Sequence, residues 1–364
     1  MKAIDLFCGC GGLSAGLRDA GYKILAGIDI EKQYIQTFTK NFPDSMSICE
    51  DISSIKPSEL LKKVGLKVGE LDLLAGGPPC QGFSKNIPRS QRQLDSENNS
   101  LVKIFLEFCE AILPKWVLME NVAEMRNGFN GHYTDEIVQR LTDAGYQVIH
   151  GVHNAADYGV PQRRRRAFFM ARRDGLAPKH PDITHTKIPT RDLFSSSQAH
   201  ISVWDAISDL RSLEIGQGTD PDAYQTSPNN EYQEYVRNGC SVVYNHIAKN
   251  LKPTQFARIC SLKPGEGIKN LPDNLRPKSG YSGAYGRLTK EMIMPTITRW
   301  VFHPGSGRWG HPVDLRLITI REAARLHGFK DCFRFFGSYT QQAGQIGNSV
   351  PPLLAKIMGK AFLN

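Results

Sequence analysis

The sequence predicts an α/β fold, a doubly wound and mostly parallel sheet with helices on both faces, together with a second, smaller and irregular domain. In the first half of the chain, short apolar runs alternate with amphipathic stretches, which is the pattern of strands connected by helices. After about residue 174 this texture changes, and residues 175–285 are rich in Pro, Gly, Ser and Asn with weak periodicity. The length of 364 residues, 40% of them hydrophobic, is enough for two domains.

Apolar runs along the chain predict the individual elements. Short runs favour strands, whereas apolar residues that recur at helical spacing favour a helix, as in residues 101–113. Residues 347–352 are expected to form a turn in which Asn348 and Ser349 cap the following helix. We expect strands at 3–7, 24–28, 71–75, 116–119 and 167–171, and helices at 13–20, 101–113, 320–327 and 351–362.

The composition restricts the kind of protein. Lys and Arg number 45 against 36 Asp and Glu, a net charge of +9 that favours a polyanionic partner, although a solvated basic surface would show the same excess. The eight cysteines include no C-x-x-C pair, which argues against a zinc cage and a disulfide framework and suits a reducing compartment. No apolar run is long enough to span a membrane, and no signal peptide is evident.

A glycine-rich turn follows the first predicted strand. Residues 5–12 have the sequence DLFCGCGG, and glycines between a strand and a helix let a ligand approach the backbone closely. A tight turn without a ligand would also explain these glycines, and the spacing differs from the dinucleotide fingerprint G-x-G-x-x-G. We expect no metal at Cys8 and Cys10, because no second cysteine pair completes a four-ligand site.

Two acidic residues, Asp29 and Asp51, follow further apolar runs. An acid at the end of the second strand is suited to holding ribose hydroxyl groups. For either residue alone, a helix cap or a solvated loop is the simpler explanation. Their position after successive strands favours a ligand-binding role.

The most informative segment is GGPPCQGFS at residues 76–84. It follows a buried strand, so Cys80 is expected at the carboxyl edge of the sheet, where open α/β sheets bind ligands. Pro78 and Pro79 stiffen the loop around the sulfur. A free cysteine is more often a small buried apolar residue, but a cysteine in this position is predicted to be a nucleophile.

Polar residues adjoin two later strands. Glu120 follows the strand at 116–119 and could protonate or hydrogen-bond a ring nitrogen, although a capping or salt-bridged glutamate is the alternative. Arg163 to Arg166 precede the strand at 167–171. If they extend that strand, Arg164 and Arg166 point to one side and could enter the site. A nuclear-localisation signal also fits four arginines.

Together these segments resemble the DNA cytosine-C5 methyltransferase family. The resemblance runs in family order through nearly the whole chain, apart from about residues 175–285, where the family carries its variable target recognition domain. The motifs that carry it are DLF…GG (5–12), PPCQ (78–81), ENV (120–122), QxRxR (162–166), RLT (287–289) with PTIT (295–298), and QIGNSVPP (345–352).

The resemblance implies a covalent mechanism. Cys80 would add to C6 of the cytosine while Glu120 holds the protonated N3. Arg166 and Arg164 would orient the base and favour the thiolate, since nearby positive charge lowers the pKa of a cysteine. These ring atoms are out of reach inside a duplex, so base flipping is implied as well. The residues that would contact the substrate are Gln81, Ser84 and Asn121.

The implied cofactor is S-adenosyl-L-methionine, with S-adenosyl-L-homocysteine as the product and no metal. Asp29 would hold the ribose, and Asp51 with Ile52 would hold the adenine edge. Ile30 departs from the family pattern, which often has an aromatic residue on the adenine face, but an aliphatic contact should suffice. The resemblance assigns cofactor binding to Phe7, Gly9, Cys10, Gly12, Asp29, Ile30, Asp51, Ile52, Pro78, Leu101, Asn348, Ser349 and Val350.

The resemblance also implies a domain organisation and a partner. Residues 1–180 plus 340–364 would form the catalytic domain, and residues 181–339 the target recognition domain and hinge. The partner would be double-stranded DNA, and no membrane is expected. We expect a cytoplasmic monomer, with functional pairing to a restriction endonuclease left open.

Two other functions stay open at this point. A methyltransferase of the same fold could act on transfer RNA, although Gly82-Phe83-Ser84 and the long insert at 175–285 favour DNA. A non-catalytic DNA-binding protein could have kept the fold, but the intact Cys80, Glu120 and arginines argue against it. The sequence does not give the target site, since base readout depends on loop geometry.

Overall fold

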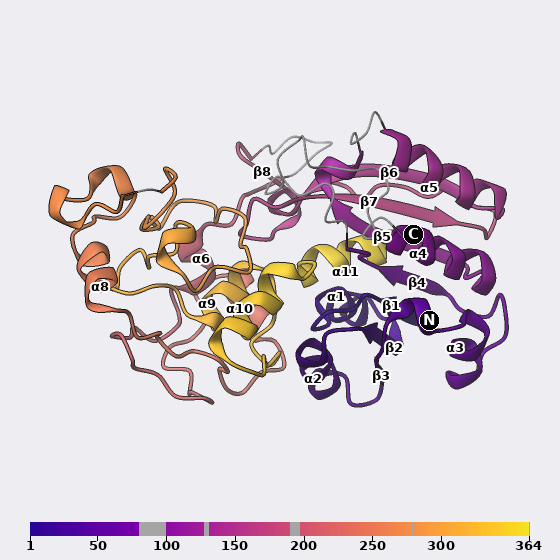
Figure 1. Cartoon of the computed structure of the whole chain (residues 1–364), viewed down its shortest axis with the longest axis horizontal. Helices are drawn as coiled ribbons and strands as arrows, with labels where there is room; N and C mark the ends of the chain where they lie inside the picture. Colours follow the sequence, from indigo (N-terminus) through magenta and orange to yellow (C-terminus); the bar gives the residue numbers. More distant parts are fainter. Residues whose placement is uncertain (80–99, 127–130, 190–196, 279, 364) are drawn as a thin grey trace. The chain divides into compact units, whose positions relative to one another are not determined.

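The computed structural model describes residues 1–79, 100–126, 131–189, 197–278 and 280–363 (Figure 1). Packing divides the chain into two compact units. The first unit consists of Met1–Tyr158, Arg165–Ile183 and Val350–Asn364, and the second of Gly159–Arg164 and Thr184–Ser349. Residues 159–164 and 340–349, which the sequence placed in the catalytic domain, therefore pack within the second unit.

A seven-stranded sheet with the order β3-β2-β1-β4-β5-β7-β6 forms the framework of the first unit (Figure 1). Strands β1 to β5 are parallel, whereas β7 is antiparallel to both β5 and β6. The strands are β1 (Lys2–Leu6), β2 (Lys23–Asp29), β3 (Met46–Cys49), β4 (Leu73–Gly76), β5 (Trp116–Val122), β6 (Gln147–Asn154) and β7 (Arg165–Arg172).

Every element predicted in this unit is present, with ends that differ by at most three residues. The sequence did not predict α2, α3, α5, β3 or β6. The β3 strand has four residues with one buried, and β6 mixes polar and apolar residues around Gly151, so neither shows a clear pattern. The helices are α1 (Gly12–Asp19), α2 (Lys32–Asn41), α3 (Pro57–Lys63), α4 (Ser100–Ile112), α5 (His132–Asp143) and α11 (Pro352–Lys360), with the 3-10 helices η1 (Ile52–Ser54), η5 (Ala123–Arg126) and η7 (Ala155–Tyr158).

Helices cover both faces of this sheet, because alternate side chains of a strand point to opposite faces. Ile4 and Leu6 of β1 belong to a buried apolar cluster that includes Phe105 of α4. Asp5, between them, accepts a hydrogen bond from Ser14 Oγ of α1 at 2.6 Å. The predicted doubly wound, mostly parallel fold is thus confirmed.

The second unit contains little regular structure, in agreement with the weak periodicity of residues 175–285. The two strands that the structure describes in this unit have two residues each and pair in parallel. Its elements are β8 (His185–Thr186), β9 (Gln198–Ala199), α6 (Val203–Ile207), α7 (Glu231–Arg237), α8 (Pro253–Cys260), α9 (Ile320–Leu326), α10 (Tyr339–Asn348) and the 3-10 helices η8 (Ile268–Asn270), η9 (Asp273–Leu275) and η10 (Pro304–Ser306).

The predicted turn at residues 347–352 is wrong in its first half. Helix α10 runs to Asn348, and Ser349 is its C-terminal cap, so neither side chain caps α11. Gly347 lies inside α10. The residue must be glycine there, because a Cβ would come within 2.2 Å of the backbone nitrogen of Arg299. Glycine therefore marks a close approach between two segments here, where the sequence pattern had suggested a turn.

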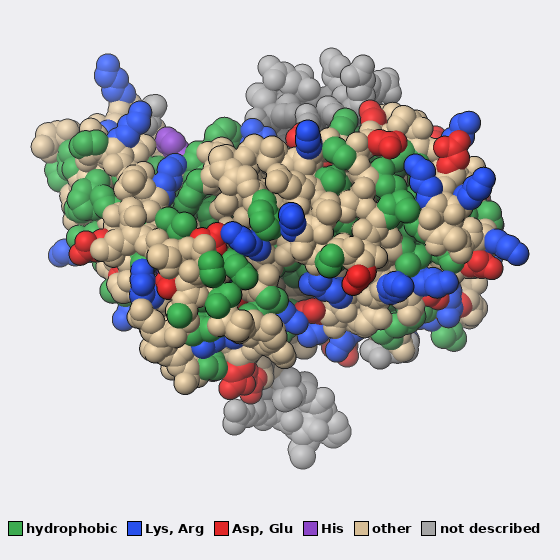
Figure 2. All heavy atoms as spheres, turned by 90° about the horizontal axis from the view of Figure 1, so that it is seen from below, with side chains coloured by type: hydrophobic (Ala, Val, Ile, Leu, Met, Phe, Trp, Pro, Cys, Tyr) green, Lys and Arg blue, Asp and Glu red, His purple; other side chains and the backbone are tan. Residues whose placement is uncertain are grey.

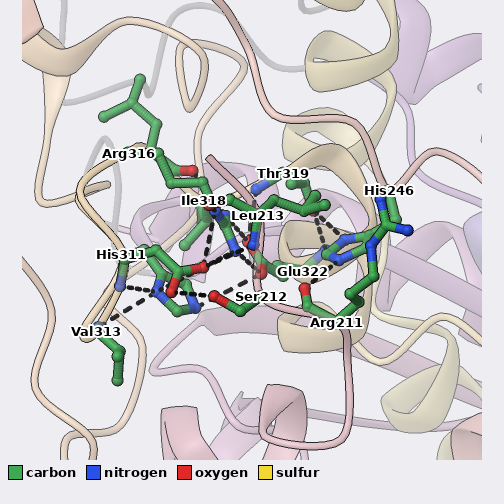
Figure 3. A network of polar contacts seen from close by, with 12 residues as sticks. Arg211, Ser212, Leu213, His246, His311, Val313, Arg316, Ile318, Thr319 and Glu322 are labelled. Carbon is green, nitrogen blue, oxygen red and sulfur yellow. Dashed lines mark hydrogen bonds and ion pairs between the residues drawn. The ribbon is translucent and has the colours of Figure 1, made fainter. Parts of the chain in front are cut away.

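A buried ionic network holds the loops of the second unit around α9 (Figure 3). Arg316 donates from Nη2 to Glu322 at 2.7 Å and to Asp314 at 2.8 Å, and it is fully buried. His311 Nε2 lies 3.6 Å from Glu322 Oε1. Burial lowers the pKa of His311 to about 4, so this ring is neutral at neutral pH.

A second network joins three more segments of the same unit. Arg325 of α9 donates to both oxygens of Asp331, at 2.9 and 2.6 Å, and to the carboxylate of Asp209. Tyr224 Oη donates to Asp331 at 2.7 Å. All three charged side chains are buried, so each depends on its partners for solvation.

Candidate active site

The carboxyl ends of five neighbouring strands bring the predicted site residues to one edge of the sheet. The strand order places the ends of β3, β2, β1, β4 and β5 side by side. At or just after the ends of the first four strands the chain carries, in the same order, Asp51, Asp29, Phe7 and Pro78. Glu120 lies two residues before the end of β5, one residue beyond the pairing of Met119 with the last residue of β4. This is the edge at which open α/β sheets bind ligands.

The glycine-rich loop after β1 folds against the end of β2. The backbone N–H of Gly9 donates to Asp29 Oδ2 at 2.8 Å. Gly9 and Gly11 have φ angles of 54° and 99°, and a Cβ at Gly11 would lie 2.5 Å from the ring of Phe42. Glycine is therefore required for the tight path of this loop into α1.

The two predicted acidic residues differ in their surroundings. Asp29 also accepts from the N–H of Glu31 at 2.9 Å, and burial raises its pKa. Asp51 is exposed and caps η1 by accepting from the N–H of Ser53 at 2.9 Å. That hydrogen bond and a second from the Ser53 hydroxyl lower the pKa of Asp51.

The remaining predicted cofactor-binding residues are divided between the two units. In the first unit, Ile30 has 64% of its surface exposed at the end of β2. Asn348 and Ser349 belong to the second unit. The other first-unit residues are buried or half-buried, and they are Cys10, Gly12, Ile52, Leu101 and Val350.

Asp5 is a buried acid that the sequence reasoning did not select as a site residue. It lies in the middle of β1 with no exposed surface, and its Oδ1 has no hydrogen-bond partner. Burial raises its pKa to about 7 despite the hydrogen bond from Ser14. The signal was present in the sequence, since a single acid interrupts an otherwise apolar strand.

Glu120 is held by Arg166 on the adjacent strand. Its Oε1 lies 2.8 Å from Arg166 Nε, and both side chains are largely buried. On its other side, a Cβ at Gly77 would lie 3.2 Å from Glu120 Oε2. The glycine after β4 thus leaves room for the carboxylate at the carboxyl edge of the sheet.

Asn121 connects the end of β5 to the loop that follows β4. Its Nδ2 donates to the carbonyl of Pro78 at 3.0 Å, and its Oδ1 accepts from the N–H of Val122 at 2.8 Å. The side chain is 3% exposed. Three predicted residues of this loop, Cys80, Gln81 and Ser84, lie outside the described residues.

Arg164 does not share a strand face with Arg166, so that prediction is wrong. Strand β7 begins at Arg165, and Arg164 packs within the second unit. Its Nη1 donates to the carbonyl of Ile297 at 3.0 Å, and its Nη2 donates to the carbonyls of Gly347 and Ser349 at 2.9 and 3.0 Å. Arg164 therefore holds the backbone on both sides of Asn348.

The charge and composition of the described surface do not define the site by themselves. On the face drawn in Figure 2, Lys and Arg side chains are scattered among other residues and do not gather in one patch. Within the described ranges, no cluster of three or more His, Cys, Asp and Glu side chains is arranged to hold a metal ion. None of the helices that the structure describes is long and apolar enough to cross a membrane.

A glycine loop and acidic side chains at the carboxyl edge of a mostly parallel sheet are typical of α/β enzymes that bind a nucleoside-containing cofactor. The family model for C-5 cytosine-specific DNA methylase matches residues 1–364. The chain therefore belongs to the C-5 cytosine-specific DNA methylase family, and it is a DNA (cytosine-5-)-methyltransferase. Membership implies S-adenosylmethionine as the methyl donor and DNA as the substrate.

Relatives and solved structures agree with this assignment. The chain is 33% identical over 381 residues to the type II methyltransferase M.DdeI of Desulfomicrobium norvegicum, covering 99% of this chain and 88% of the relative. It is 33% identical to the type II methyltransferase M1.HphI of Haemophilus parahaemolyticus, covering 99% and 86%. A prophage-encoded E. coli protein described as a DNA modification methyltransferase superposes with a TM-score of 0.79 at 25% identity, covering 100% and 99%.

Proposed function

We propose that this enzyme methylates C5 of a cytosine flipped out of a specific double-stranded DNA sequence, through a covalent bond between Cys80 and C6. The observation that carries the proposal is the order of Asp51, Asp29, Phe7, Pro78 and Glu120 along one edge of the sheet. This order supports the proposal, because a nucleoside held by the first four residues would lie beside the acid that would act on the base.

The first unit offers features that fit S-adenosylmethionine. The positive φ angles of Gly9 and Gly11 bring the loop backbone close to the carboxyl edge, where the amino-acid end of the cofactor would lie. Asp29 is fixed by two backbone N–H groups and would hold the ribose hydroxyls. The exposed side chains of Ile30 and Asp51 would contact the adenine. When bound, the sulfonium supplies an electrophilic methyl group.

The reaction on the base would use Cys80 and Glu120. The Cys80 thiolate adds to C6, which makes C5 enamine-like, and Glu120 holds a proton on N3 so that negative charge does not build up on the ring. Arg166 orients the Glu120 carboxylate through the 2.8 Å contact to Oε1. After methyl transfer, loss of the C5 proton and elimination of Cys80 restore the aromatic ring.

Asn121 and Arg164 would act as positioning residues. The hydrogen bond from Asn121 to the carbonyl of Pro78 fixes the loop two residues before Cys80 in the sequence. We therefore assign Asn121 a role through this loop in addition to the predicted substrate contact. Arg164 would fix the backbone around Asn348 within the second unit, because it binds the carbonyls of Gly347 and Ser349.

The type II relatives favour further proposals about partners. We propose that a restriction endonuclease of the same specificity accompanies the enzyme. We also propose that it acts as a monomer in the cytoplasm and uses no metal. DNA is favoured over transfer RNA because the family model that matches the whole chain is one of DNA methylases.

A covalent-trapping experiment tests the mechanism. Wild-type protein should form a denaturation-resistant complex with DNA that contains 5-fluorocytosine, because fluorine cannot leave as the proton does. The Cys80→Ser variant should bind the same DNA without forming this complex, since a hydroxyl is far less ionised than a thiol at neutral pH. Cys260→Ser is the matched control and should trap normally. Full methyl transfer by Cys80→Ser would refute the mechanism. Trapping on transfer RNA instead of DNA would refute the assignment of DNA as the substrate.

We further propose that residues 185–285 of the second unit determine the target sequence. Their loops are joined by side-chain networks, and base readout requires side chains on shaped loops. Exchanging this segment with that of a relative of different specificity should move the methylated sequence with the segment, as read by bisulfite sequencing. A chimera that is active on the original sequence would disprove the assignment.

A further inference from the structure

We propose that Cys240 and Cys332 are an oxidation site of the second unit, where a peroxide converts their two thiols into a reversible disulfide. Both residues are free cysteines, Cys332 is exposed, and Cys240 is half-buried. The backbone N–H of Cys332 donates to Cys240 Sγ at 2.9 Å. This modification is independent of methyl transfer and does not involve Cys80.

The fold holds the two cysteine-bearing segments together. The N–H of Asp331 donates to the carbonyl of Val236 at 2.8 Å, one residue before the contact between Cys332 and Cys240. Asp331 is fixed in turn by the ion pair with Arg325. The 2.9 Å contact between the Cys332 nitrogen and the Cys240 sulfur therefore makes the two cysteines neighbours across these segments, as a disulfide requires.

The surroundings make one thiol the nucleophile. The neighbouring Cys240 side chain, followed by the positive charges of Lys330 and Arg321, lowers the pKa of the Cys332 thiol. The proximity of Cys332, together with burial, raises the pKa of Cys240. Cys332 is thus the more readily ionised thiol of the pair, and it is the more exposed of the two residues.

The chemistry is balanced with hydrogen peroxide as the oxidant. The Cys332 thiolate attacks one peroxide oxygen, the O–O bond breaks, and a sulfenic acid and one water form. The Cys240 sulfur then attacks the sulfenic sulfur, which gives the disulfide and a second water. The two thiols lose two protons and two electrons in total, and the peroxide takes them up to become two waters. A dithiol reductant reverses the change by thiol–disulfide exchange.

Other cysteines of the described chain lack this combination. Cys8 and Cys10 are close in sequence, but both are buried, and burial raises their pKa. Burial likewise raises the pKa of Cys109 and of the more exposed Cys260. These residues therefore provide internal controls for oxidation.

Peptide mapping of the full-length protein tests the proposal. The Cys80→Ala background removes the proposed nucleophile, and the protein is treated with hydrogen peroxide, alkylated with N-ethylmaleimide and digested with trypsin without reduction. Cleavage after Arg237, Lys249, Lys330 and Arg334 yields peptides 238–249 and 331–334, each with one of the cysteines. We expect them as one cross-linked species, lighter than their sum by two hydrogen atoms and absent after dithiothreitol.

Variants show whether the link depends on this pair. Cys332→Ser keeps the backbone N–H that binds Cys240, so it should fold and yet give no cross-link. Cys260→Ser should cross-link as the parent does. The cross-link should also form at least about tenfold faster in native protein than in urea, because the fold holds the thiols together. Equal rates in urea, or recovery of the two peptides only as separate alkylated or over-oxidised species, would overturn the proposal.

Discussion

The two units of this enzyme position their functional residues by different physical means. In the first unit, hydrogen bonds between parallel strands fix where each strand ends, and the ends carry the side chains of the proposed site. In the second unit, buried arginines reach across loops that are far apart in sequence. The first arrangement is set by backbone register, whereas the second depends on individual side chains.

This difference affects how each unit tolerates substitution. The core of the first unit is a continuous cluster of apolar residues, so replacing one buried apolar residue leaves most of the remaining packing in place. In the second unit, Arg325 satisfies two buried carboxylates, Asp209 and Asp331. Removing one such partner leaves uncompensated buried charge, which costs more than the net contribution of an intact pair.

The largest expected effect is on catalysis in the first unit, in the variant Glu120→Gln. The amide keeps the shape of the side chain but cannot supply an acidic proton to N3, so the methyl-transfer rate should fall by about 10²–10⁴-fold. Single-turnover transfer of radiolabelled methyl groups to DNA measures this rate. Cofactor affinity, measured by calorimetry, should change little.

The control for this variant is Glu110→Gln on α4, where the carboxylate pairs with Arg140 at the surface. It should transfer methyl groups at the wild-type rate. A Glu120→Gln variant as fast as wild type would mean that the position of Glu120 beside Gly77 and Arg166 has no role in proton transfer.

Sequence patterns predicted the register-dependent part of the molecule well. The DLFCGCGG turn, the strand before Pro78 and the strand that contains Glu120 are local patterns, so the fold class and the carboxyl edge of the sheet could be inferred. Arg164 was misplaced, because its alternation with Arg166 assumed that both residues belong to the strand. The strand begins at Arg165, one residue after Arg164. The pairing of Arg325 with Asp209 spans 116 residues and leaves no local signal in either segment.

The next largest effect concerns the stability of the second unit, in Arg325→Met. The long apolar side chain fills similar space but leaves Asp209 and Asp331 buried without their cation. We expect the free energy of unfolding of this unit to fall by about 3–5 kcal/mol. Hydrogen–deuterium exchange resolved by peptide should show that α6, α7 and α9 exchange faster in the variant than in wild type. Exchange in β1, β4 and β5 should be the same in both proteins.

Arg276→Met provides the matched control in the same unit, since Arg276 forms a solvent-exposed pair with Asp273 at 3.0 Å. Its loss should cost less than about 1 kcal/mol, because exposed ion pairs contribute little. If the two variants were equally stable, the buried network would not be what holds the loops of the second unit.

The smallest expected effect returns to the first unit and depends on pH, in Asp5→Asn. The pKa of Asp5 is raised from 3.8 to about 7, so the folded state binds a proton that the unfolded state releases. Its contribution to stability is fully present below about pH 4 and is lost as the pH rises through about 7. An asparagine is neutral throughout, so the variant should match wild type at pH 4 and be more stable by roughly 2–4 kcal/mol at pH 8.

Urea unfolding at pH 4, 6 and 8 measures this difference, with Asp44→Asn as a control on the surface of the same unit. Ser14→Ala provides an independent check. The hydrogen bond from Ser14 lowers the pKa of Asp5, so its removal should shift the pH-dependent loss of stability to higher pH. A stability difference between Asp5→Asn and wild type that stays constant with pH would contradict a proton on Asp5. The titration of this buried acid would then contribute nothing to the pH dependence of the first unit's stability.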